Sequence, residues 1–288
     1  MDTSFDPRVE KPAYAAGGPR VLFDEAHHNS HKARRSYRPF VEMIEADGYQ
    51  VERNTAKITP ASLAPFAVLI VVNASGTNER NDDPAFADSE CDAIRDWVSS
   101  GGALLLVADH YPMGHAAESL ATRFGVRLSK GQVEDPVHFD PTFESTHLVF
   151  SRENDGLASH PIVEGRNATE RVSRVLTFTG EAVYADPPAV GFLRLSPTAL
   201  ARPPEPKVER RGGDVIVNVT YGDPAAVPGW SQGLALDHGS GRLVVLGEAA
   251  MLSAQLSSYD GRRIGMNVTG YDNRQLGLNI MHWLTRIL

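Results

Sequence analysis

The sequence predicts an α/β protein with a mostly parallel sheet flanked by helices and an elaborated β-rich middle segment. Apolar runs of strand length alternate with amphipathic segments of helical length over the first 126 residues. One run, residues 65–75, is apolar almost throughout, as expected of a strand covered on both faces. With 42% hydrophobic and 22% charged residues, the composition is typical of a globular protein with a sizeable core.

Hydrophobic periodicity and helix-ending glycines define the elements of the first half. In the first helix Tyr37, Phe40 and Ile44 share one face, and Gly48 ends it. In order along the chain, we predict a strand at 20–25, a helix at 32–48, strands at 49–54 and 65–75, a helix at 88–100, a strand at 103–110 and a helix at 116–126.

The second half is richer in turn formers and histidines. We predict a hairpin over 233–252 that turns at Gly239-Ser240-Gly241, and a final helix over 272–288 that begins near Asp272 or Asn273. Further strands are predicted at 146–151, 172–180, 189–196 and 214–222, with Pro-rich loops at 184–189 and 201–214. Residues 1–19 are predicted to form a flexible arm, and residues 20–288 one domain in which 127–232 is an elaboration.

Charge and cysteine content exclude several classes of function. The formal net charge of −8 argues against binding to nucleic acid or to an anionic membrane, because both need basic faces. Cys91 is the only cysteine, so intramolecular disulfides and thiolate metal cages are excluded, and its helical spacing favours a buried core thiol. No apolar run reaches membrane-spanning length, so we expect a cytoplasmic protein. The expected partner is a small-molecule substrate. Whether the chain forms a homo-oligomer is left open.

Four stretches carry a resemblance to a known superfamily. The stretches "LLLVADH" with "AAESLATRFGV", "GRLVVLGEAAML" and the terminal "DNRQLGLNIMHWL" resemble a bacterial branch of the class I glutamine amidotransferase-like superfamily, which has a flavodoxin-like sheet. The chain is also similar to the gliding-motility and intraflagellar-transport domains that share the fold. The resemblance covers roughly residues 20–126 and 233–288. It implies that the strands at 20–25 and 103–110 are neighbours in the sheet.

The sequence departs from the amidotransferase pattern at the residues that carry that activity. Those enzymes place a nucleophilic Cys after the strand that corresponds to 103–110, where this chain has Asp109 and His110. Their later His-x-Glu pair has Glu248 as its nearest counterpart, without the His. The departures argue against glutaminase chemistry through a thiolate.

Polar clusters follow three of the predicted strands. In open α/β sheets, ligands bind beyond the carboxyl ends of the strands, so these clusters are the candidate site. They comprise Asp24, Glu25, His27, His28 and His31 after the first strand; Asp109, His110 and His115 after the fourth; and Glu248 after the late hairpin strand.

A divalent metal such as zinc suits this collection, because zinc accepts imidazole and carboxylate ligands and activates a bound water. The candidate metal ligands are His27, His28, His31 and His110, and the candidate catalytic groups are Glu248, Asp109 and Glu25. Other interpretations stay open. The first cluster alone favours a polar loop with a helix N-cap, Asp109 could cap the next helix, and Glu248 could bind loop amides.

The middle segment offers His138, Asp140 and His147, either as part of a lid over the strand ends or as ordinary surface groups. The leading hypothesis is a hydrolase of a small-molecule ester or amide with a metal-bound His/carboxylate site. The first alternative is a non-catalytic sensing or scaffold domain that has lost the nucleophile. The second alternative is a metal-free acid–base enzyme that uses Asp109 with His110.

Overall fold

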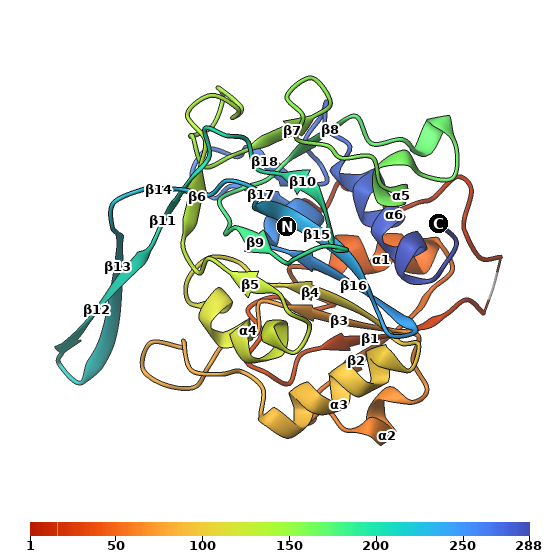
Figure 1. Cartoon of the computed structure of the whole chain (residues 1–288), viewed down its shortest axis with the longest axis horizontal. Coiled ribbons are helices and arrows are strands. Elements are labelled where there is room, and N and C mark those ends of the chain that lie inside the picture. Colours follow the sequence, from red (N-terminus) through yellow and green to blue (C-terminus); the bar gives the residue numbers. More distant parts are fainter. Residues whose placement is uncertain (16) are drawn as a thin grey trace.

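A nine-stranded sheet forms the centre of the computed structural model, which describes residues 1–15 and 17–288 (Figure 1). Its strand order is β2-β1-β3-β4-β16-β15-β9-β5, with β10 paired beside β15. The strands are β1 (Arg20–Asp24), β2 (Gln50–Asn54), β3 (Val68–Val72), β4 (Ala103–Val107), β5 (Arg127–Leu128), β9 (Val183–Tyr184), β10 (Val190–Arg194), β15 (Ser231–His238) and β16 (Gly241–Leu246).

Strands β2, β1, β3, β4 and β16 run parallel, and the remaining pairs are antiparallel. Val107 is in register with both Val72 of β3 and Leu246 of β16, so these three strands end at one level. The predicted fold class is confirmed. The implied pairing of β1 with β4 is wrong, because β3 lies between them.

Helices cover both faces of the parallel strands. Val68, Ile70 and Val72 of β3 pack into one core with α1 and α6, while Leu69 and Val71 pack into a second core with α3 and α4. The helices are α1 (Arg38–Ala46), α2 (Pro60–Leu63), α3 (Asp88–Ser99), α4 (Met113–Thr122), α5 (Pro161–Glu164) and α6 (Asn273–Leu284), with the 3₁₀ turns η1 (Ala168–Glu170) and η2 (Ala250–Leu252). Helix α1 begins six residues later than the predicted 32, because residues 33–37 form turns instead.

The middle segment extends the sheet through β5, β9 and β10 and adds smaller sheets. These are β14-β11-β6 (Ala225–Ala226, Leu200–Arg202, Gln132–Glu134), β7-β8 (Val149–Ser151, Arg174–Leu176), β17-β18 (Ala254–Leu256, Arg263–Gly265) and β12-β13 (Pro204–Arg211, Asp214–Tyr221). The β12–β13 hairpin projects from the body at the left of Figure 1. A loop over 201–214 was therefore the wrong prediction, because most of it pairs as β12 with β13.

The N-terminal residues contact the body at several points. The backbone N–H of Asp2 donates to the carbonyl of Ala254 over 2.9 Å, and that of Tyr14 donates to Asp47 over 3.1 Å. The predicted flexibility of this arm stays a prediction. In the described part of the chain, no helix is long and apolar enough to cross a membrane.

Candidate functional site

The turns that follow β4 and β16 meet at one edge of the sheet. The Asp109 carboxylate accepts the backbone N–H of Ala249 over 3.4 Å and that of His110 over 2.8 Å. The hydroxyl of Tyr37, in the turn before α1, donates to the Ala249 carbonyl over 2.5 Å. This hydrogen bond holds the turn after β16. Two of the three predicted clusters are therefore brought together, because β4 and β16 are neighbours.

Asp109 lies in an environment that favours its protonated form. Its side chain is 16% exposed. Burial is the largest influence and raises its pKa to about 6, against the opposing effects of His110 and of the hydrogen bonds that the carboxylate accepts. A carboxyl group with a pKa near the working pH can change its charge during a reaction, which is a property of acid–base groups. The prediction that Asp109 caps the next helix is not what the structure shows, since the N-cap of α4 is Pro112, without a side-chain hydrogen bond.

His110 is the most accessible ionisable group of this turn, with its side chain 33% exposed. Its Nδ1 lies 3.2 Å from the carbonyl oxygen of Tyr111 and 3.1 Å from the hydroxyl of Tyr221. A carbonyl oxygen can only accept, so we assign the proton to Nδ1. The lone pair is then on Nε2, which lies 3.7 Å from Oδ1 of Asp109.

Glu248 is fully buried behind Asp109. Its two carboxylate oxygens accept the backbone N–H groups of Ala250 over 2.5 Å and Met251 over 2.8 Å. Burial and the neighbouring Asp109 charge raise its pKa well above the usual value. Of the two interpretations left open for Glu248, this geometry matches the hydrogen bonds to loop amides.

Sequence reasoning missed Glu181, a second fully buried carboxyl group. Its pKa is also raised well above the usual value, first by burial, and the Asp109 charge contributes. Its Oε2 accepts the backbone N–H of Lys130 over 2.5 Å, whereas Oε1 is buried without a hydrogen-bond partner. Oε1 lies against the first turn of α4, where a side chain on Gly114 would overlap it. Gly180-Glu181 repeats the Gly-Glu pair of Gly247-Glu248, and that repeat could have identified it.

Asn73, at the end of β3, joins the turn after β1 to the turn after β4. Its side-chain oxygen accepts the backbone N–H of Asp109 over 3.0 Å, and its carbonyl accepts that of Ser30 over 3.0 Å. Ser75 adds two further bonds to the first turn, with the carbonyls of His27 and His28. The first cluster is therefore joined to Asp109 through the end of β3.

His27 lies buried between two carboxylates. Its Nδ1 donates to Asp24 over 2.8 Å and its Nε2 donates to Glu90 of α3 over 3.0 Å. Burial lowers its pKa, but the hydrogen bonds and charges of Asp24 and Glu90 outweigh burial, and the net pKa is raised. Both ring nitrogens are occupied by these carboxylates, so neither is free to bind a metal.

The remaining members of the first cluster have separate surroundings. Glu25 accepts the backbone N–H of Ala33 and pairs with Arg53 over 2.6 Å. The His31 ring lies 4.9 Å from that of Tyr37, and burial lowers its pKa to about 4. His28 is exposed. Among the residues that the structure describes, no three His, Cys, Asp or Glu side chains are arranged to hold a metal ion. The four predicted ligands are thus not brought together, and the metal itself stays a prediction.

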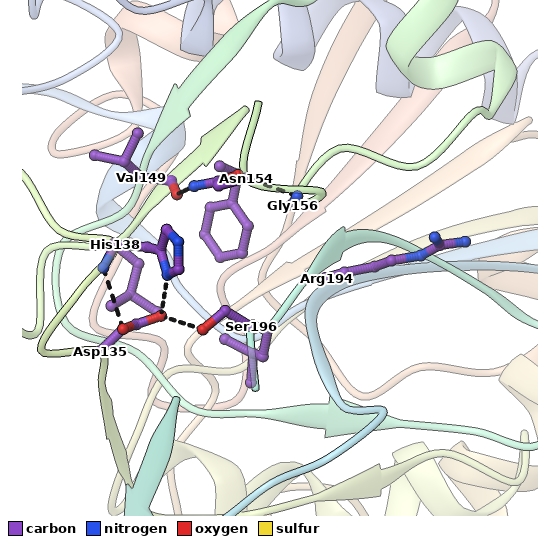
Figure 2. A pocket seen from close by; sticks show the side chains of 10 residues that line it. Asp135, His138, Val149, Asn154, Gly156, Arg194 and Ser196 are labelled. Atoms are coloured by element: carbon purple, nitrogen blue, oxygen red, sulfur yellow. Dashed lines mark hydrogen bonds and ion pairs between the residues drawn. The ribbon is translucent and has the colours of Figure 1, made fainter. Parts of the chain in front are cut away.

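A polar cluster in the middle segment involves His138. Figure 2 shows His138 and Ser196 both directed at Asp135, the former over 3.2 Å and the latter over 2.5 Å. In a Ser-His-Asp triad the Ser hydroxyl bonds to the His, whereas here both donate to one carboxylate. The cavity that these residues line is about 10 Å³, the size of a single water. The arrangement of these three side chains therefore differs from that of a catalytic triad.

The other three candidates lie in separate local surroundings. Asp140 accepts the hydroxyl of Tyr271, and the His147 ring stacks on Phe143 at 4.9 Å. His115 lies in the first turn of α4 with its Nδ1 buried and without a partner, and its ring contacts that of Tyr111 at 5.3 Å. A lid role for the middle segment stays a prediction.

No protein-family model matches this sequence, and no curated protein matches it. Solved structures are similar in fold. The mmIFT52 N-terminal domain superposes with a TM-score of 0.64 at 15% identity, covering 92% of this chain and 97% of that one. The cytoplasmic protein STM3548 from Salmonella typhimurium gives 0.49 at 12% identity, over 92% and 98% of the two chains. A ThuA-like protein from Bacteroides uniformis gives 0.45 at 14%, over 96% and 93%. The first of these superpositions supports the fold class. At identities this low, the activity of a similar structure cannot be transferred to this chain.

Proposed function

We propose that this protein is a hydrolase of small-molecule esters or amides in which His110 and Asp109 act on a water molecule. The observation that carries the proposal is the geometry of the pair. The His110 side chain is partly exposed, and its Nε2, to which we assign the lone pair, lies 3.7 Å from the Asp109 carboxylate. The pair stands beyond the carboxyl end of β4, where open α/β sheets bind their ligands.

In the proposed reaction His110 Nε2 is the general base. It removes a proton from a water whose oxygen forms a bond to the carbonyl carbon of the substrate. The bond from that carbon to the leaving oxygen or nitrogen then breaks, and the imidazolium returns the proton to the leaving atom. The Asp109 carboxylate stabilises the imidazolium while it exists, and the hydrogen bonds of Nδ1 with Tyr111 and Tyr221 hold the ring.

Buried carboxyl groups complete the environment. Glu248 and Glu181 do not contact solvent, so they are positioning groups in this scheme rather than groups that touch the substrate. Glu248 holds the backbone of the turn that donates to Asp109. A divalent metal is not needed for these steps, and zinc remains an outcome that the experiment below can reveal.

The test compares hydrolysis of p-nitrophenyl esters by the wild type with that by His110→Gln and Asp109→Asn. We expect kcat/KM to fall by about 100-fold or more for His110→Gln, the usual size of a general-base contribution. His238→Gln, at the last residue of β15 and at the opposite edge of the sheet, is the matched control. Unchanged rates in both site variants would overturn the proposal. Loss of activity in EDTA with recovery in zinc would replace it with the metal-dependent form.

The second candidate is a non-catalytic binding domain of the amidotransferase-like superfamily. It is favoured by the β12–β13 hairpin, which projects with Val208, Val215 and Ile216 exposed. It predicts no hydrolysis of any ester and a stable complex that depends on these side chains. Size-exclusion chromatography compares the wild type with a variant that has Ser at these three positions, and the second candidate predicts that only the wild type forms the complex. Cytoplasmic location stays a prediction for both.

A further inference from the structure

The β12–β13 hairpin has one apolar and one polar face. Directly opposed residues of antiparallel strands lie on the same face, and residues two apart along a strand do too. From the register, in which Val208 opposes Val217, one face carries Pro204, Pro206, Val208, Arg210, Val215, Val217, Val219 and Tyr221. The opposite face carries Glu205, Lys207, Glu209, Arg211, Asp214, Ile216, Asn218 and Thr220.

Three contacts at different positions show what the apolar face covers. At the base of the hairpin, Tyr221 reaches His110 over 3.1 Å. Near the middle, Val208 lines a cavity of about 350 Å³ with Asn78, Glu79 and Arg80. Further out, Arg210 forms an ion pair with Glu79. The outer part of the apolar face, at Val208 and Arg210, therefore lies beside residues 78–80, with open space between them. We name this space the hairpin cleft.

The loop 76–83 is a wall tied to the candidate site. Within the loop, the Asp83 carboxylate accepts the backbone N–H groups of Thr77 over 2.6 Å and Asn78 over 2.8 Å. The Tyr111 hydroxyl donates to Asp82 over 3.1 Å, and Tyr111 directly follows His110 in the chain. Both walls of the hairpin cleft are thus anchored beside His110.

We propose that the hairpin cleft binds the apolar chain of the substrate, so that the protein prefers esters of long-chain over short-chain acids. This inference rests on the proposed hydrolase function. The occupant is the substrate, because the apolar face runs without interruption from Val208 to Tyr221, whose hydroxyl touches His110. Val208 and Val217 lie four residues from Pro204 and Tyr221, so the apolar length is roughly 13 Å at about 3.3 Å per residue.

Beyond that length the cleft becomes charged, because Arg210 pairs with Glu79 across it. An alkyl chain would gain burial along the valines and none past Arg210, so the preference has an upper limit. On the opposite, polar face, the exposed side chain of Ile216 points away from the cleft.

The experiment measures kcat/KM for p-nitrophenyl acetate and decanoate. Val208→Ser is compared with Ile216→Ser, because the two side chains are 40% and 39% exposed on opposite faces of the same hairpin. We expect wild type and Ile216→Ser to prefer decanoate, and Val208→Ser to lose about tenfold of that preference, the usual effect of a changed apolar contact. An equal decanoate-to-acetate ratio in wild type and Val208→Ser would overturn the inference.

A binding measurement separates this inference from the proposed function. The ketone 2-decanone has an apolar chain and no hydrolysable bond, and saturation-transfer NMR detects its binding. If no ester is cleaved but 2-decanone binds and the Val208→Ser variant weakens it, the hairpin cleft stands and the hydrolase proposal falls. If esters are cleaved but 2-decanone binds neither protein, the cleft proposal falls and the hydrolase stands.

Discussion

The hydroxyl of Tyr221 lies 3.1 Å from Nδ1 of His110, although the two residues are 111 positions apart in the chain. His110 belongs to the turn after a core strand, and Tyr221 belongs to the base of a hairpin that projects from the body. The contact makes the hairpin part of the candidate site.

Replacement of Tyr221 by Phe tests this contact alone. The ring stays, so apolar contact in the hairpin cleft is kept, while the hydrogen bond to His110 is lost. We expect kcat to fall by about tenfold, the order of one lost hydrogen bond to a group that becomes charged. KM and the decanoate-to-acetate ratio should stay unchanged. A fall in that ratio without a change in kcat would show that Tyr221 only packs against substrate.

The pH dependence of hydrolysis should reflect the ionisation of the Asp109 carboxyl group. Its pKa is raised to about 6, chiefly by burial, and the proposed reaction needs its ionised form. We expect kcat/KM to be full at pH 8 and to decline as the pH falls through about 6. In Asp109→Asn most of the activity should be lost together with the Asp109 contribution to this acid limb, and the limb that remains belongs to the general base His110. An acid limb of the same position in the variant would assign it to another group.

His27 should be a stability residue and not a catalytic one. Its replacement by Ala leaves Asp24 and Glu90 buried without their shared partner, and breaking a buried ion pair costs about 3–5 kcal/mol. Urea unfolding measures this loss. His28→Asn is the control, because His28 is exposed with φ +49°, a conformation that Asn tolerates.

The same residue gives a pH dependence of stability. Because the folded-state pKa of His27 is raised above the usual 6.5, the folded protein binds this proton more tightly than the unfolded chain. Its contribution is complete below pH 6.5 and is lost as the pH rises through the raised folded-state value. The stability difference between wild type and His27→Ala should therefore shrink above pH 6.5. A constant difference would show that the ring acts by packing alone.

We expect Gly114→Ala to destabilise the protein, although a change from Gly to Ala in a helix usually stabilises it. In a helix interior, Ala is normally more stable than Gly by about 0.5–1 kcal/mol. Here the new methyl group would overlap Oε1 of Glu181, so we expect a loss of about 1–3 kcal/mol, as for other overpacked sites. A double-mutant cycle with Glu181→Ala should show strong coupling. Thr122→Ala, exposed in the last turn of the same helix, should be additive.

Local patterns predicted most of the fold. The apolar run of β3, the periodicity of α3, and the turn between β15 and β16 are each encoded by adjacent residues. Strand order could not be predicted from local patterns, because the position of β3 between β1 and β4 depends on contacts across the whole core. The sequence also predicted that Asp109, His110 and Glu248 lie near a common edge, since all three follow strands.

The missed features depend on partners that are distant in sequence. Glu90 lies 63 residues from His27, and its hydrogen bond is what turns a candidate metal ligand into a buried ion pair. Strand β12 was predicted as a loop because its prolines and charges hide an alternation that only its pairing with β13 reveals. Glu181 was missed because its place beside the turn after β16 depends on a distant contact, in which its backbone N–H donates to the carbonyl of Gly247 over 2.7 Å.

The Asp109 carboxylate accepts a hydrogen bond from the backbone N–H of Ala249, which lies 140 residues further along the chain. Contacts of such large sequence separation form late, because closing a long loop costs entropy before any contact is gained. During synthesis, β1 to β4 can pair while β16 has not yet been made. The candidate site should therefore be absent from nascent chains that already protect the first four strands from hydrogen exchange, and it should appear only when β16 docks against β4.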